Sequence, residues 1–120
     1  MLRNILLVAI GGATGSVLRY LIGLSLRVSN FPAATFIINI IGCLLIGIII
    51  GFTSKNSTDQ FQWRLLLATG FCGGFTTFSA FSYESLQLIQ EQRWLASLLY
   101  ISASVIIGIT ATFAGFWISK

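Results

Sequence analysis

Four long runs of apolar residues, separated by short polar stretches, make up almost the whole chain. The runs cover residues 4–26, 32–52, 63–90 and 94–118. A helix needs about 20 apolar residues to cross the hydrocarbon core, and only helices or closed barrels satisfy their backbone hydrogen bonds there. These runs are too long and continuous for barrel strands. The pattern therefore predicts an all-α membrane protein with four transmembrane helices in a single domain, residues 1–120.

Small residues recur four positions apart in every run. This spacing places them on one helix face and lets helix backbones approach closely in lipid. We therefore expect a tightly packed bundle. The pairs are Gly11 and Gly15, Gly47 and Gly51, Gly70 and Gly74, and Ala111 and Gly115.

The third run is unusual because its middle, residues 70–82, holds three glycines and four hydroxyl-bearing side chains. Adjacent glycines followed by two β-branched residues form a poor helix. We therefore expect this helix to break at mid-membrane, within the stretch from Gly73 to Phe81, and to leave backbone carbonyls without their usual partners. Such a break is tolerated only where protein, water or an ion satisfies it. Carbonyl oxygens suit a hard cation such as Na⁺.

Composition removes most alternatives to a membrane protein. Only 8% of the residues are charged, against about 25% in soluble domains. The basic residues are scattered, so nucleic acid is not a predicted partner. The chain has no histidine, metal-ligand cluster or carboxylate pair, which makes an enzyme the least favoured class. Cys43 and Cys72 lie inside apolar runs, where packing is favoured over a disulfide.

The basic residues also bear on orientation. Four spans put both termini and the middle loop on one side of the membrane. A firmly oriented protein shows a clear excess of basic residues on its cytoplasmic side, whereas here the division is nearly even. We favour dual topology with an antiparallel dimer; the alternative is a single orientation with weak signals. One side holds Arg3, Lys55, Arg64 and Lys120, and the other Arg19, Arg27 and Arg93.

Polar and aromatic residues within the spans are candidates for an ion path. The amide of Asn39 is suited either to a hydrogen bond between helices or to donation toward an anion. Phe78 and Phe81 are three apart, and packing is the common role of such a pair. Ring edges, however, carry positive potential and stabilise an anion without a fixed charge. Tyr100 and Ser104 share one face of the fourth run.

Two charged residues also lie inside the spans. Arg19 in the first run must reach water or a partner. Glu84 in the third run is one candidate partner; alternatively, Arg19 lines a vestibule that attracts anions. The sequence leaves both interpretations open.

Three segments of the chain resemble the Fluc/CrcB family of fluoride channels, and the resemblance extends over all four runs in order. The segments are 11–20 (GGATGSVLRY), 35–42 (TFIINIIG) and 70–82 (GFCGGFTTFSAFS). The resemblance implies a dual-topology antiparallel homodimer in the cell inner (plasma) membrane. Its two pores would export fluoride passively down the electrochemical gradient and lower cytoplasmic fluoride. It implies a structural Na⁺ at the dimer interface and no organic cofactor; the partners would be a second copy, fluoride and the lipid bilayer.

By motif position, the resemblance also implies a role for each candidate residue. Arg19 would lie in an aqueous vestibule, and the backbone carbonyls of Gly73 and Thr76 from both subunits would hold the Na⁺. Ala80 stands where the family often has threonine, and Gly108 where a hydroxyl is expected, so the polar lining departs from the family pattern at these positions. The fluoride pathway would include Asn39, Phe78, Ser79, Phe81, Tyr100 and Ser104.

Two other classes of membrane protein have a similar size and span count. A small multidrug antiporter needs a carboxylate in its first helix to exchange protons for a cationic substrate. The first run has no acidic residue, and Glu84 is the only acid within a span. A structural membrane subunit would explain the close packing but would leave the broken third helix without a purpose.

Overall fold

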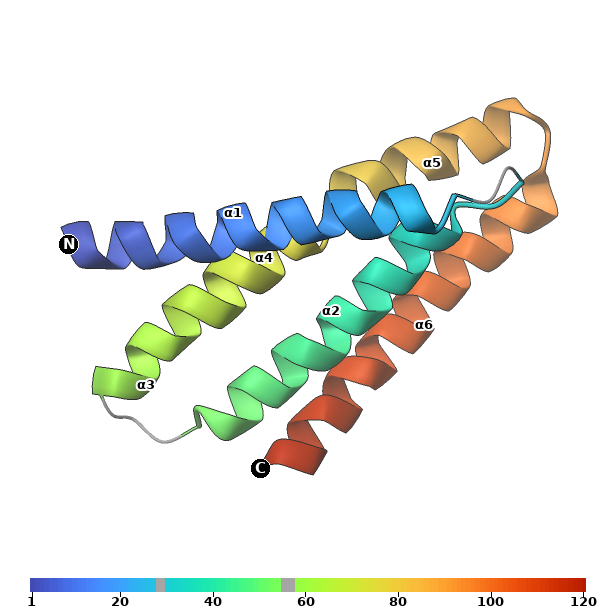
Figure 1. Cartoon of the computed structure of the whole chain (residues 1–120). Coiled ribbons are helices and arrows are strands. Elements are labelled where there is room, and N and C mark those ends of the chain that lie inside the picture. Colours follow the sequence, from blue (N-terminus) through green and yellow to red (C-terminus); the bar gives the residue numbers. More distant parts are fainter. Residues whose placement is uncertain (28–29, 55–57) are drawn as a thin grey trace.

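The described part of the chain forms four helical units, each long and apolar enough to cross a membrane (Figure 1). The computed structural model describes residues 1–27, 30–54 and 58–120, and these residues include no strand. The predicted all-α architecture is confirmed. Lys55, which the orientation argument uses, lies outside the described residues. The units are α1 (Leu2–Ser25), α2 (Ala33–Phe52), a third unit (Thr58–Gln90) and α6 (Trp94–Ser119).

The third unit is divided into four segments. It begins with α3 (Thr58–Trp63) and continues as the π-helix η1 (Arg64–Cys72), then α4 (Gly73–Phe75) and, after a break, α5 (Phe78–Gln90). A π-helix has wider turns with i→i+5 hydrogen bonds, and runs of this length are rare. The sequence does not predict η1.

The break lies at Thr76 and Thr77, which both have extended backbones (φ −82°, ψ 159° and φ −150°, ψ 115°). The prediction of a broken helix is confirmed, and the break falls within the predicted stretch, just after the glycines. Gly73 is still helical, with φ −62° and ψ −38°. Gly74 packs so tightly on α1 that a Cβ there would overlap the backbone of Gly12. This contact supports the helix through the glycines, so the β-branched pair after them leaves it instead.

The units associate as two pairs. Helix α2 packs along α6, and α1 packs across η1 and α4 (Figure 1). Small residues occupy both contacts, so the backbones approach closely, as expected where lipid provides no hydrophobic drive between helices. The glycines at which an added Cβ would come closer than 3.0 Å to a facing backbone atom are Gly11, Gly15, Gly47, Gly51, Gly74 and Gly115.

We expect Gly15→Ala to destabilise the contact between α1 and the third unit. A Cβ at this position would overlap the carbonyl oxygen of Phe71 and would lie 2.8 Å from the backbone nitrogen of Phe75. Backbone atoms cannot rotate away, so the free energy of unfolding should fall by about 2 kcal/mol. The measurement is the thermal midpoint in detergent. Gly23→Ala on the same helix meets open space and should leave the midpoint unchanged; equal midpoints for both variants would contradict this packing.

Candidate functional site

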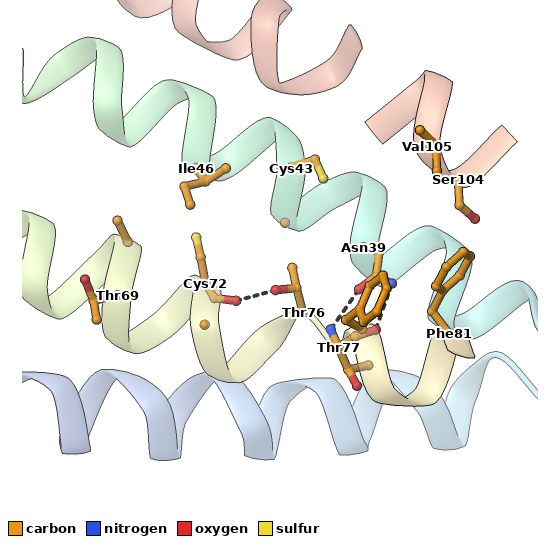
Figure 2. A pocket seen from close by; sticks show the side chains of 14 residues that line it. Asn39, Cys43, Ile46, Thr69, Cys72, Thr76, Thr77, Phe81, Ser104 and Val105 are labelled. Atoms are coloured by element: carbon orange, nitrogen blue, oxygen red, sulfur yellow. Dashed lines mark hydrogen bonds between the residues drawn. The ribbon is translucent and has the colours of Figure 1, made fainter. Parts of the chain in front are cut away.

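The side chain of Asn39 on α2 forms two hydrogen bonds with the backbone at the break. Its Oδ1 accepts a hydrogen bond from the N–H of Thr77 at 2.9 Å, and its Nδ2 donates to the carbonyl of Thr77 at 3.1 Å (Figure 2). The Thr77 hydroxyl in turn accepts from the N–H of Ala80 at 3.2 Å and so caps α5. The amide therefore replaces the helical partners that the break removes. One of its two N–H groups is used in this way.

The break removes the helical partners of the carbonyls at the end of α4, among them those of Gly73 and Thr76. In an unbroken helix they would accept from Thr77 and Ala80, four residues on. Those two N–H groups bond instead to Asn39 and to the Thr77 hydroxyl. Among the described residues, no group of three or more His, Cys, Asp or Glu side chains could hold a metal ion. Backbone oxygens are hard ligands, so these two carbonyls fit the chemistry of a small hard cation.

A cavity of about 450 Å³ lies beside the break, between α2, the third unit and α6 (Figure 2). Most of its wall is apolar, and none of the described residues that line it is charged. It brings together six of the residues that the sequence identifies as candidates. These are Asn39, Gly73, Thr76, Phe78, Phe81 and Ser104.

Three aromatic rings form a row that leads from this cavity. The ring centroids of Phe78 and Phe81 are 5.6 Å apart, and those of Phe81 and Tyr100 are 5.2 Å apart. Tyr100 is completely buried, whereas Phe78 is 79% exposed. The ring of Phe78 therefore stands largely uncovered at the mouth of the apolar cavity.

Glu84 lies at the far end of this row and bonds to two hydroxyl groups. Its Oε1 accepts from Thr35 Oγ1, and its Oε2 accepts from Tyr100 Oη, both at 2.7 Å. A membrane carboxyl requires such partners. The carboxyl also borders a second, polar cavity of about 220 Å³ that Arg93 lines as well.

Arg19 is not the hydrogen-bonding partner of Glu84 in this structure. Its Nε is buried and has no hydrogen-bond partner in the described part of the chain. Sequence reasoning missed Thr35 as a partner of Glu84. The available signal was its position four residues before Asn39, which places both polar side chains on the same face of α2.

Ser79 and Ala80 lie around the site without lining the cavity, whereas Ser104 lines it. Ser79 is exposed, and its hydroxyl lies 3.2 Å from that of Thr77. Ala80 is half-buried beside the cap of α5. The hydroxyl of Ser104 is buried with no protein partner among the described residues.

Gly108 has a neighbour that accounts for its lack of a hydroxyl. A Cβ there would lie 3.3 Å from the sulfur of Cys43, which fills this space. Cys43 and Cys72 are both free thiols, in agreement with a packing role.

The comparisons with known proteins cover nearly the whole chain. A family model described as CrcB-like protein, Camphor Resistance (CrcB), matches residues 6–116. A relative from Flavobacterium psychrophilum, named Fluoride-specific ion channel FluC, is 47% identical over 99% of this chain and 98% of its own length. A relative of the same name from Phocaeicola vulgatus is 45% identical over 99% and 100%. Another from a Caulobacter species is 45% identical over 99% and 96%.

Proposed function

The chain belongs to the CrcB family, and from this premise we propose that it is a fluoride-specific ion channel, a transporter and not an enzyme. Relatives that match it from end to end carry the name of a fluoride-specific channel. The observation that carries the proposal is the cavity at the break, where Asn39, Phe78 and Phe81 meet without a charged side chain. Such a site can solvate an anion in the membrane by weak donors alone.

The proposed path uses donors that are too weak to trap the ion. Fluoride is small and strongly hydrated, and a fixed lysine would bind it too tightly for release, while weak sites in series allow both entry and exit. The second N–H of Asn39 and the hydroxyl of Ser104 are available as donors at the cavity. The positive edges of the Phe78 and Phe81 rings add electrostatic stabilisation of the ion.

The other pathway residues extend this route at either side. Tyr100 continues the row of rings, Ser79 adds a hydroxyl near the break, and Arg19 attracts anions from a vestibule. The family membership implies no organic cofactor.

We further propose that the functional unit is an antiparallel homodimer with two pores. The exposure of Phe78 and the open apolar cavity support a second copy as the cover, and the even division of basic residues supports dual insertion. The test uses two fusions after Lys120, one to a reporter that is active only on the inner side of the membrane and one to a reporter that is active only on the outer side. Dual topology predicts signal from both fusions. Signal from one fusion alone would contradict dual topology.

A structural Na⁺ is proposed at the interface between the two copies. The carbonyls of Gly73 and Thr76 from each copy would hold it, and the ion would supply positive charge that neutralises the inward-facing carbonyl dipoles. The test replaces Na⁺ with N-methylglucamine and follows the thermal midpoint of the dimer in detergent. A lower midpoint without Na⁺ supports the site, and an unchanged midpoint contradicts it.

The proposed location is the cell inner membrane, where a passive fluoride path protects the cell. HF crosses lipid in acid surroundings and dissociates inside, and the trapped anion then needs an exit. The experiment that tests the function uses purified protein in liposomes loaded with fluoride or with chloride. With valinomycin and a K⁺ gradient to set the voltage, fluoride should leave rapidly and chloride should stay. Equal rates for the two anions, or no fluoride loss above protein-free liposomes, would overturn the function.

A further inference from the structure

We propose that Gly42 is a positioning residue for the break in the third unit. Its missing side chain provides the space in which the methyl group of Thr76 lies, and this contact sets where the backbone of the break runs beneath α2. The inference rests on the proposed function only for its readout, the rate of fluoride efflux.

Gly42 packs directly against the break. It is buried on α2, three residues after Asn39 and therefore on nearly the same helix face. A Cβ at this position would overlap the Cγ2 methyl carbon of Thr76 and would lie 3.5 Å from Cδ1 of Phe75. Figure 2 shows Thr76 on the side of the break that faces α2. Any residue larger than glycine would compete with Thr76 for this volume.

The methyl group of Thr76 cannot turn away without loss. The hydroxyl on the same Cβ donates to the carbonyl of Cys72 at 2.8 Å, and this bond fixes the rotamer (Figure 2). Rotation would give up the bond to Cys72. If the rotamer is kept, the backbone of Thr76 must move away from α2, and its carbonyl moves with it.

The same face of α2 thus holds two consecutive residues of the break by different means. Asn39 holds Thr77 with two hydrogen bonds, and Gly42 holds Thr76 by close packing. Phe78 follows immediately and begins α5. A shift of Thr76 therefore moves the start of α5 and the ring that stands at the mouth of the cavity.

The experiment is a double-mutant cycle between positions 42 and 76, with fluoride efflux from liposomes as the readout. We expect Gly42→Ala to lower the efflux rate about tenfold or more, because displacement of about 1 Å in a site has effects of this order. Thr76→Ser removes the methyl group and keeps the hydroxyl. In the Thr76→Ser background, Gly42→Ala should change the rate by less than about threefold, as expected for two residues in direct contact.

A matched variant separates the methyl group from the hydroxyl. Thr76→Val replaces the hydroxyl with a second methyl and loses the bond to Cys72. Valine is stiff about its first side-chain torsion, and methyl groups then fill two of the three staggered positions, so Gly42→Ala should remain harmful in this background. Gly47→Ala serves as the control for general packing damage. Its Cβ would overlap the backbone of Thr112 on α6, and Thr76→Ser should not relieve its effect.

The proposal is tested by comparing the effect of Gly42→Ala in the wild-type and Thr76→Ser backgrounds. Recovery of fluoride efflux in the Thr76→Ser background supports the proposal. The same holds if Gly42→Ala alone fails to assemble, as judged by size-exclusion chromatography, and the double variant assembles and conducts. The proposal is overturned if Gly42→Ala has wild-type efflux, or if its loss is the same in the Thr76→Ser background. Efflux by the wild-type protein in the same preparation separates this result from a failure of the proposed function.

Discussion

Replacement of Phe81 or Phe78 with isoleucine is expected to abolish fluoride efflux while the protein still assembles. Isoleucine is apolar and fills much of the ring's volume, so packing suffers little, but it has no quadrupole and no positive edge. The ion would then lose part of its solvation at the cavity. We expect a fall of about a hundredfold, which corresponds to about 2.7 kcal/mol in the barrier.

The measurement is fluoride efflux from liposomes beside size-exclusion chromatography of the same samples. Phe52→Ile is the matched control, because Phe52 ends α2 away from the cavity and is exposed. It should keep wild-type efflux. An assembled Phe81→Ile protein that conducts at the wild-type rate would show that the rings have only a packing role.

The second large effect is expected at Asn39. Asn39→Leu removes both hydrogen bonds to Thr77 and leaves a backbone N–H and a carbonyl unpaired within the membrane. Each unsatisfied group costs about 1–3 kcal/mol. We expect both a markedly lower thermal midpoint and the loss of fluoride efflux, because the break is no longer held against α2.

Asn39→Asp separates the role of the accepting oxygen of the amide from that of its donating nitrogen. Aspartate keeps an oxygen that accepts from the Thr77 N–H, but an ionised carboxylate cannot donate to the Thr77 carbonyl. We therefore expect a midpoint between those of the wild type and Asn39→Leu, with efflux still lost because a negative charge repels the anion. An Asn39→Leu protein with a wild-type midpoint would contradict a stabilising role for the two hydrogen bonds between Asn39 and Thr77.

The four spans and the broken third helix could be predicted from the sequence because both depend on local properties. Apolar runs of spanning length have few structural alternatives. The series Gly73, Gly74, Phe75, Thr76, Thr77 is a poor helix wherever it occurs. The exact residue at which the helix breaks within that stretch could not be predicted, because it depends on how Gly74 packs against Gly12 in another helix.

Partner choice within the site also required the structure. The sequence allowed Asn39 to bond either to a neighbouring helix or to an anion. In the structure its oxygen and one of its N–H groups bond to Thr77, which lies 38 residues further along the chain. Arg19 was one candidate partner for Glu84, but Thr35 and Tyr100 hold that carboxyl instead. Such pairings arise from the crossing of helices. Spacing within one helix places polar side chains on a shared face but does not identify their partners.

We propose that the cavity at the break conducts fluoride and excludes chloride without a fixed charge. The most direct test is a voltage clamp of a planar bilayer that contains the purified protein, with a fluoride gradient and equal chloride on both sides. The current should reverse at the equilibrium potential of fluoride. With a chloride gradient and equal fluoride on both sides, the gradient-driven current should vanish. A reversal potential that follows chloride as closely as fluoride would contradict a fluoride-selective path.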